Sequence, residues 1–257
     1  MKARPADEMR PPSSLLLLVE GQRATMEIAS LLPAAPWLRR APRGDGHPVL
    51  VLPGFTAGDE STIALRVYLR DLGYRAHRWK LGRNLGFGGR RDHFESRLVH
   101  RLGVIFHRFG RRVSLVGWSL GGIYAREIAR AAPHMVRQVI TLGSPFAGRG
   151  RGSNVRRLYE VVTGRKVPRH DPEMLERMHE PPPVPSTAIF SRTDGVAHWR
   201  ACIERTGPHT DNIEVFGSHC GLGFNPAVLY AIADRLAQAE DGWQPFDRRG
   251  WRRLVYR

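Results

Sequence analysis

The stretch VSLVGWSLGGIYAREI, residues 113–128, decides the fold. Its first part, Val113-Ser114-Leu115-Val116, has the pattern of a buried strand. In the middle, Gly117-Trp118-Ser119-Leu120-Gly121 has the spacing G-x-S-x-G, and its glycines permit a sharp, strained turn from strand to helix. The stretch therefore predicts a strand, a tight turn that lifts the Ser119 hydroxyl above a sheet, and a helix. An ordinary Gly-Ser turn is the alternative.

The same alternation of strands and helices continues on both sides of this stretch. The chain has 257 residues, which fits one large α/β domain. Strands are expected at residues 49–52, 74–81, 113–117, 136–142, 187–191 and 213–217. Helices are expected at residues 60–72, 94–109, 120–132, 197–205 and 226–239. Six strands separated by helices predict an open, mostly parallel six-stranded sheet flanked by helices.

Three segments lie outside this alternation. Before residue 47 we expect a helix that is capped by Ser13 and ended near residue 32 by Pro33 and Pro36. Residues 148–183 interrupt the rhythm with charged, helical segments, and residues 241–257 form a basic, aromatic tail. The face of the N-terminal helix expected to pack on the body contains Leu15, Leu18, Met26 and Ala29.

The chain is strongly basic, with 40 Lys+Arg against 24 Asp+Glu and a formal charge of +16. Almost all of the basic charge is arginine, because the lysines are Lys2, Lys80 and Lys166. The arginine pairs are scattered and form no single stripe, so no specific nucleic-acid partner is expected. A polyanion-binding protein remains an alternative function.

The cysteine content and the short apolar run of the sequence bear on the cellular location and on metal binding. The two cysteines, Cys202 and Cys220, lack zinc-ligand spacing, and no metal or cofactor is expected. We expect them to lie close together, with free thiols favoured in a reducing compartment. The Leu15–Val19 run is too short for a secretory core or a membrane span. A cytoplasmic location is therefore expected, with weak, peripheral association with anionic membranes as the alternative.

Two residues that could activate Ser119 follow later strands. A serine hydroxyl needs a base to take its proton. His219 lies on a loop just past an expected strand, at the sheet edge where ligands bind in such folds, whereas His209 should lie at the opposite edge. Asp194, also at a strand end, is the best candidate to orient the histidine. A turn-forming Asp194-Gly195 pair is the competing interpretation.

An acyl-transfer intermediate carries an oxyanion that needs two preorganised N–H donors. One should be Leu120, immediately after Ser119. The other should come from the loop after the first strand, where Gly54 permits close approach. Phe55 is the first choice there, and Thr56 is the alternative.

Together these segments resemble bacterial lipases and esterases, serine hydrolases of the α/β-hydrolase superfamily. The resemblance covers roughly residues 48–239 and implies an α/β-hydrolase domain at residues 47–240, with a short helical lid insertion at about 148–183. Two segments fall outside it: an N-terminal helical extension at residues 1–46 and a basic tail at residues 241–257. Many true lipases carry His-Gly where this chain has Pro53-Gly54, so the resemblance favours ester hydrolysis over long-chain lipase activity. It rests on Leu52-Pro53-Gly54-Phe55, Gly117-Trp118-Ser119-Leu120-Gly121-Gly122, Ser191-Arg192-Thr193-Asp194-Gly195 and Gly217-Ser218-His219.

The function implied is cleavage of a small-molecule or lipid ester through an acyl-enzyme on Ser119. An acyltransferase with the same triad and a non-catalytic binding protein on the same scaffold are the alternatives, and the sequence leaves the oligomeric state open. Aromatic residues expected near the crevice could line an acyl pocket, although such residues are as often plain core. They are Trp118, Phe87, Phe146 and Trp199.

Overall fold

The structure is a computed structural model of the chain, and it describes residues 11–86, 91–147 and 172–257. Six strands form one sheet in the order β2-β1-β3-β4-β5-β6. Every neighbouring pair is parallel, which confirms the predicted open sheet. The strands are β1 (Pro48–Leu52), β2 (Arg75–Arg78), β3 (Val113–Trp118), β4 (Val136–Leu142), β5 (Ser186–Phe190) and β6 (Thr210–Glu214).

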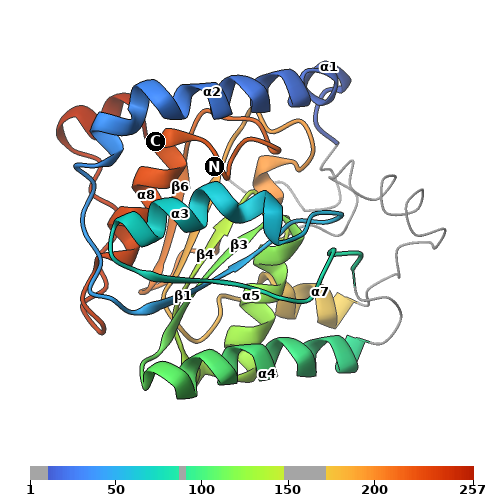
Figure 1. Ribbon diagram of the computed structural model, residues 1–257. Coiled ribbons are helices and arrows are strands. Elements are labelled where there is room, and N and C mark those ends of the chain that lie inside the picture. The colour runs from blue at the N-terminus through green and yellow to red at the C-terminus, as the bar shows by residue number, and fades with distance from the viewer. Residues whose placement is uncertain (1–10, 87–90, 148–171) are drawn as a thin grey trace.

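Helices cover both faces of the sheet (Figure 1). One face carries α2 (Glu20–Leu38), α3 (Ile63–Asp71) and α8 (Pro226–Leu236). The opposite face carries α4 (Arg91–Phe109) and α5 (Leu120–Ala131). The remaining helical elements are short: α1 (Ser14–Leu18), α7 (Pro172–His179), η2 (Asp59–Thr62), η3 (Pro133–Met135), η4 (Trp199–Ala201) and η5 (Gly250–Leu254).

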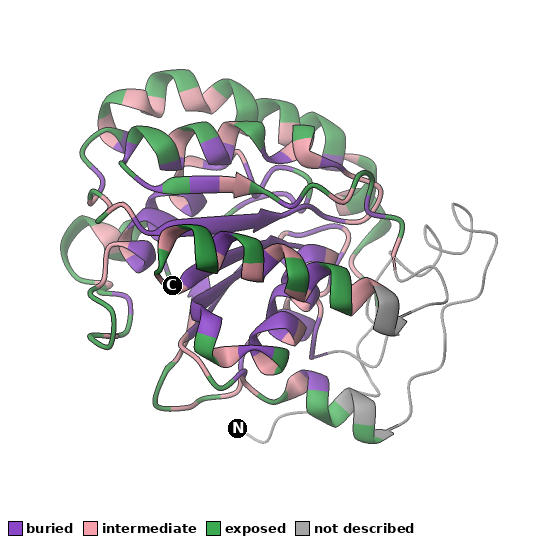
Figure 2. Cartoon of the chain, turned by 60° about the horizontal axis from the view of Figure 1, so that its bottom comes forward, coloured by how far each residue is buried: buried purple, intermediate pink, exposed green. Residues whose placement is uncertain are grey.

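Side chains alternate between the two layers along each central strand. Val49 and Val51 of β1 pack with α3 and α8, whereas Leu50 and Leu52 pack with α4 and α5. This is the two-period pattern of a strand, and it leaves β1, β3 and β4 buried throughout (Figure 2). Burial on both faces explains why the sequence of β1 is a continuous apolar run.

The predicted helix at residues 197–205 is wrong, because the structure has only the short η4 there. Asn212 on β6 provides the physical reason. Its side-chain oxygen accepts from the Glu204 N–H at 2.7 Å, and its amide donates to the Glu204 carbonyl at 3.0 Å. These bonds hold the backbone at Glu204 to the edge of the sheet. The edge strands also differ from expectation, since β2 is shorter and β6 begins earlier.

The N-terminal helices correct two further predictions. Pro33 and Pro36 do not end the helix but lie inside α2. Each proline removes one N–H bond, and the carbonyls left without that donor, of Ala29 and Leu32, belong to exposed residues that water can reach. The predicted packing face is also wrong, because its members are exposed: Leu15, Leu18, Met26 and Ala29.

The C-terminal segment packs on the same side of the sheet as α2. Glu214 of β6 and Arg257 exchange two backbone hydrogen bonds, at 3.1 and 3.2 Å. Phe246 and Tyr256 are buried with α8. Trp251 of η5 meets Trp37 of α2 edge to face, with ring centroids 5.4 Å apart.

Candidate active site

Ser119 lies at the sharp turn between β3 and α5. Its backbone has φ 52° and ψ −119°, a conformation that residues other than glycine seldom adopt and that costs energy to hold. Glycine is required two residues later, at Gly121, because a Cβ there would collide with the carbonyl oxygens of Leu52 and Pro53. The turn places the hydroxyl at the N-terminus of α5, where the helix dipole favours developing negative charge.

Three residues predicted from the sequence meet at the carboxyl edge of the sheet. The Nε2 of His219 lies 2.9 Å from the Oγ of Ser119. Its other ring nitrogen, Nδ1, lies 2.6 Å from Oδ2 of Asp194. When Nδ1–H donates to the carboxylate, Nε2 is left as the acceptor for the Ser119 proton. All three side chains are buried, so water competes little with these bonds.

Asp194 is fixed by its own loop, residues 191–197. Its second oxygen, Oδ1, accepts from the N–H groups of Val196 at 2.8 Å and Ala197 at 2.7 Å. The turn-forming role considered for this residue is therefore present, and it is compatible with the contact to His219. One carboxylate oxygen holds the loop while the other faces the imidazole.

His219 is held in a second loop, residues 216–221. The indole Nε1 of Trp118 donates to the His219 carbonyl at 3.0 Å. The two loops also bind each other, because Ser191 Oγ donates to the Gly217 carbonyl at 2.7 Å. Two other histidines downstream of Ser119 lie outside this contact: His198 caps η4, and His209 packs edge to face on Trp243.

Sequence reasoning missed Glu20, which joins these two loops. This residue is only 4% exposed. It accepts from the Gly195 N–H at 2.7 Å in one loop, and from the N–H groups of His219 at 3.1 Å and Cys220 at 3.0 Å in the other.

Arg23 and Glu27, on the same face of α2, bind the same two loops. Arg23 donates to the carbonyl and hydroxyl oxygens of Thr193 at 2.6 and 2.9 Å. Glu27 accepts from the N–H and hydroxyl of Ser218 at 2.8 and 2.5 Å. The sequence carried one signal for these contacts, the distribution of charge. Glu20, Arg23 and Glu27 are the charged residues of positions 13–38, and their helical spacing places them on one face.

Opposing effects act on the pKa of His219. Burial alone would lower it, but the charge and hydrogen bond of Asp194, and then the charge of Glu20, outweigh burial. The pKa is therefore raised above 6.5, the reference value expected from the sequence. A base in this site is protonated more readily than a free histidine.

The residues expected to bind an oxyanion lie beside the turn. Leu120 is the first residue of α5. Phe55 lies in the loop after β1, and a Cβ on its neighbour Gly54 would be 3.4 Å from Cβ of Ser119. Thr56, the alternative donor, uses its N–H to bind the Asn84 carbonyl at 2.7 Å. This bond occupies the N–H of Thr56.

The aromatic residues expected to line a pocket have several environments. Phe146 is buried against Ala188, with the Arg126 guanidinium 3.7 Å from its ring centre. Trp118 is buried in the core, and Trp199 stacks on Phe190 with centroids 6.0 Å apart. Phe87 lies outside the described residues, as do residues 148–171 of the expected lid.

Both cysteines are free thiols. Cys202 is buried beside Phe190 and Ala197, and its pKa is raised by burial. Burial, and then Glu20, raise the pKa of Cys220 to about 12. Neither thiol is therefore primed as a nucleophile.

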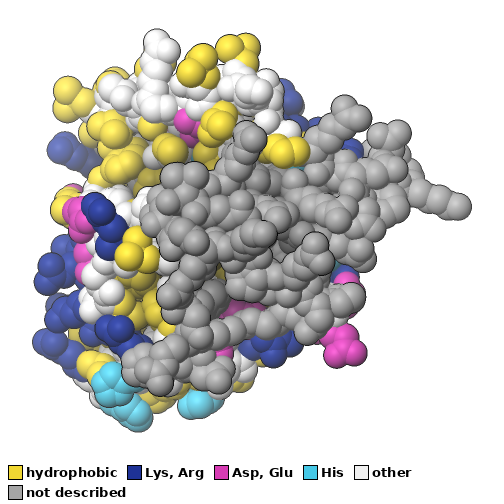
Figure 3. Space-filling model, turned by 90° about the vertical axis from the view of Figure 1, so that its right-hand side faces the viewer, with side chains coloured by type: hydrophobic (Ala, Val, Ile, Leu, Met, Phe, Trp, Pro, Cys, Tyr) yellow, Lys and Arg dark blue, Asp and Glu magenta, His cyan; other side chains and the backbone are white. Residues whose placement is uncertain are grey.

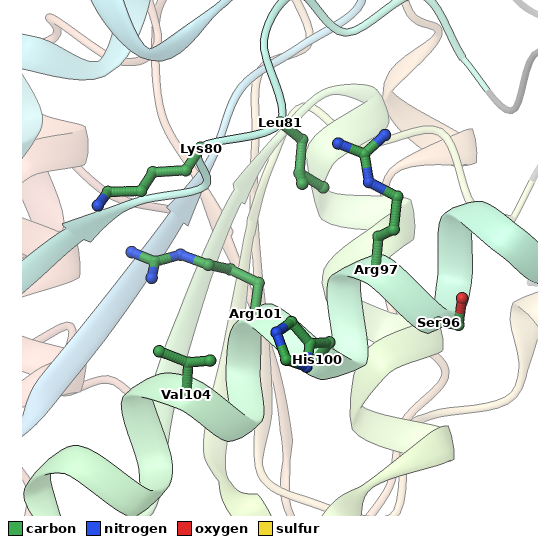
Figure 4. Close-up of a pocket in the computed structure, with 7 residues that line it drawn as sticks. All are labelled: Lys80, Leu81, Ser96, Arg97, His100, Arg101 and Val104. Atoms are coloured by element: carbon green, nitrogen blue, oxygen red, sulfur yellow. The ribbon is translucent and has the colours of Figure 1, made fainter.

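A surface pocket elsewhere contains none of these residues. Its lining comes from α4 and the segment after β2 (Figure 4): Lys80, Leu81, Ser96, Arg97, His100, Arg101 and Val104. Across residues 11–86, 91–147 and 172–257, no cluster of three or more acidic, histidine or cysteine side chains could hold a metal ion. In the same part of the chain, no helix combines the length and apolar character needed to cross a bilayer.

The sheet order, its covering helices and the turn at Ser119 are those of the α/β-hydrolase fold, and solved structures agree. No protein-family model and no curated protein matches the chain. The monoacylglycerol lipase of Paleococcus ferrophilus has a TM-score of 0.52 at 15% identity, covering 73% of this chain and 96% of that one. Lipase B of Aspergillus fumigatus has a TM-score of 0.54 at 14% identity, covering 77% of this chain and 54% of that one.

An α/β superfamily hydrolase from Oenococcus oeni PSU-1 has a TM-score of 0.53 at 14% identity, covering 74% of this chain and 91% of that one. At identities this low, the similarity establishes the α/β-hydrolase fold, whereas function must be argued from the site.

Proposed function

We propose that the protein is a serine hydrolase that cleaves carboxylic esters through an acyl-enzyme on Ser119. The observation that carries the proposal is the hydrogen-bonded chain from Ser119 through His219 to Asp194, whose serine lies in a strained turn at the N-terminus of α5. The neutral imidazole takes the Ser119 proton as the hydroxyl oxygen attacks the ester carbonyl carbon. Asp194 holds the tautomer that leaves Nε2 free and stabilises the imidazolium that forms.

The tetrahedral intermediate bears a negative oxygen beside the turn. The N–H groups of Leu120 and Phe55 would bind it, and the N-terminus of α5 would add to this stabilisation. Collapse of the intermediate expels the alcohol, which takes the proton from His219 and leaves the acyl group on Ser119. Water, deprotonated by His219, then attacks the acyl-enzyme and releases the acid.

A panel of p-nitrophenyl esters from acetate to palmitate tests the proposal. Release of p-nitrophenol by the purified protein, at a rate abolished by a fluorophosphonate, is the expected result. An acyltransferase would instead give more acylated product than free acid when a competing alcohol or amine is added. Absence of turnover and of fluorophosphonate labelling would support a non-catalytic protein.

A further inference from the structure

The charged face of α2 binds both loops that carry the proposed acid and base. We propose that Glu20 is a positioning residue that sets the distance between Asp194 and His219. The proposal rests on the proposed function for its kinetic consequences. Its physical basis is the set of three backbone N–H groups, those of His219, Cys220 and Gly195, that converge on one carboxylate.

The bonding of Glu20 is unusual for a helical carboxylate. A buried carboxylate is costly unless its lone pairs are satisfied, and here they are satisfied by main chain from two separate loops. Neither loop can move away from the other without breaking at least one of these charge-assisted bonds. Arg23, 3.9 Å from Glu20, binds the loop of Asp194, and Glu27 binds the loop of His219. This charged face of α2, formed by Glu20, Arg23 and Glu27, therefore acts as a brace between the two loops.

Close packing supports the same conclusion at Gly195. A Cβ on this residue would lie 2.5 Å from the carbonyl carbon of Leu16 in α1. The absence of a side chain therefore lets α1 lie directly on the Asp194 loop. The N-terminal helices therefore form part of the surroundings of the proposed acid, Asp194.

Glu20→Gln tests the brace. The amide presents an N–H₂ group where one carboxylate oxygen accepted, so at least one of the three backbone N–H groups loses its acceptor. We expect kcat for p-nitrophenyl butyrate to fall about tenfold to a hundredfold with little change in KM, since small misplacements of reacting groups have effects of this size. The acidic limb of the pH profile should move to lower pH, because a negative charge near His219 is lost.

The other charged or titratable groups near His219 are Asp194, Arg23, Glu27 and Cys220, and Glu20→Gln leaves all four in place. Glu20→Asp separates position from charge: it should lower kcat but keep the pH midpoint. Glu60→Gln, at an exposed carboxylate, is the matched control and should match the wild type.

Hydrogen exchange provides a readout independent of activity. The amides of Gly195, His219 and Cys220 should exchange faster in Glu20→Gln and Glu20→Asp than in the wild type. Unchanged kcat, pH midpoint and amide exchange in Glu20→Gln would overturn the proposed positioning role of Glu20. If the wild type has no esterase activity, the proposed function fails, while the exchange experiment still tests whether Glu20 holds the two loops together.

The outer face of the same two helices carries a second, independent inference. All three charged residues of positions 13–38 face inward, so the outer face is uncharged. Leu15, Leu18 and Leu32 are 68%, 81% and 84% exposed. Figure 3 shows hydrophobic side chains over the top of the molecule, where α1 and α2 lie. Exposed apolar surface of this kind marks an interaction site.

We infer that this face docks on an anionic lipid surface. Exposed Arg39 and Arg40 follow α2 directly, and exposed Arg253 lies in η5, next to Trp251, which contacts α2. Apolar residues flanked by arginine and tryptophan suit the boundary between lipid headgroups and acyl chains. The charge of +16 attracts anionic lipid and opposes pairing with a second copy of this chain.

Flotation with lipid vesicles tests the docking. Vesicles containing phosphatidylglycerol should bind the protein at low salt, and vesicles of phosphatidylcholine alone should bind it much less. Leu18→Glu and Leu32→Glu should each weaken binding about tenfold or more, as loss of a buried leucine predicts. Val104→Glu adds the same charge at an exposed residue of α4, across the sheet, and should bind as the wild type.

Three outcomes would overturn the docking. The first is no binding to either vesicle, and the second is equal weakening by all three variants. The third is a wild-type dimer that Leu18→Glu converts to a monomer, which would assign the face to a second copy of the chain.

Discussion

The Nε2 atom of His47 lies 2.8 Å from the Oγ of Ser114, almost the distance found between His219 and Ser119. On its other side, Nδ1 of His47 lies 2.5 Å from Oδ1 of Asp45. The protein therefore contains a second Ser-His-Asp chain of hydrogen bonds. It involves the second residue of β3, near the end opposite Ser119.

The local backbone separates the two arrangements. Ser114 is a fully buried residue within a regular strand, and no helix begins beside it. Burial lowers the pKa of His47 to about 4, so this histidine stays neutral and serves as a structural bridge. Ser119 instead occupies a strained turn at a helix N-terminus. Hydrogen-bond geometry alone thus does not define an active site.

The pH dependence of activity should follow His219. Its pKa is raised because Asp194 and Glu20 stabilise the imidazolium more than burial destabilises it. Only the neutral form can take the Ser119 proton, so activity is lost as pH falls through the raised pKa. We predict that kcat/KM on a soluble ester rises with a midpoint above 6.5. A midpoint below 6.5 would contradict the electrostatics.

Asp194→Asn should lower kcat by about 10⁴-fold, because the amide favours the wrong imidazole tautomer. Asp211→Asn is the matched control. Asp211 pairs with Arg248 at 3.0 Å and accepts from the Phe246 N–H at 2.7 Å, which ties the C-terminal segment to β6. Steady-state kinetics on both variants checks the assignment. An active Asp194→Asn beside an inactive Asp211→Asn would show that the acid is misidentified.

The stability of the fold should depend on Arg126. This buried residue of α5 forms an ion pair with buried Glu204, and Glu204 also accepts from the Ser186 hydroxyl at 2.5 Å. Arg126→Met leaves that carboxylate buried without its partner, which typically costs about 3–5 kcal/mol. Urea denaturation measures the loss.

Arg205→Met serves as the comparison, because it breaks a more exposed ion pair with Glu176. That loss should be about 0–1 kcal/mol. Equal losses in the two variants would mean that the buried pair has no special role in stability.

Local patterns in the sequence predicted most of the fold and the three central residues. The strand at 49–52 is an apolar run, and Asp194 and His219 follow strands whose ends meet at one edge. The predicted start of a helix at Pro226 is confirmed, and the Asn225 side chain caps this helix, α8.

What the sequence did not reveal depends on contacts between distant segments. Glu20 reaches His219 across 199 positions, and no local pattern encodes that partner. The apolar spacing at Leu15 and Leu18 suggested a buried face, whereas the helix buries its charged face instead. Pro33 and Pro36 usually end helices, but an exposed helix can carry them because water satisfies the freed carbonyls.

Fluorophosphonate labelling of Ser119→Ala beside Ser114→Ala tests the central claim most directly. Each variant removes the hydroxyl from one of the two Ser-His-Asp chains, so the comparison isolates the effect of the turn. We predict that the wild type and folded Ser114→Ala are labelled on the peptide containing Ser119, and that Ser119→Ala is folded but unlabelled, with ester hydrolysis reduced about 10⁴-fold or more. Covalent labelling that persists in Ser119→Ala would contradict the account.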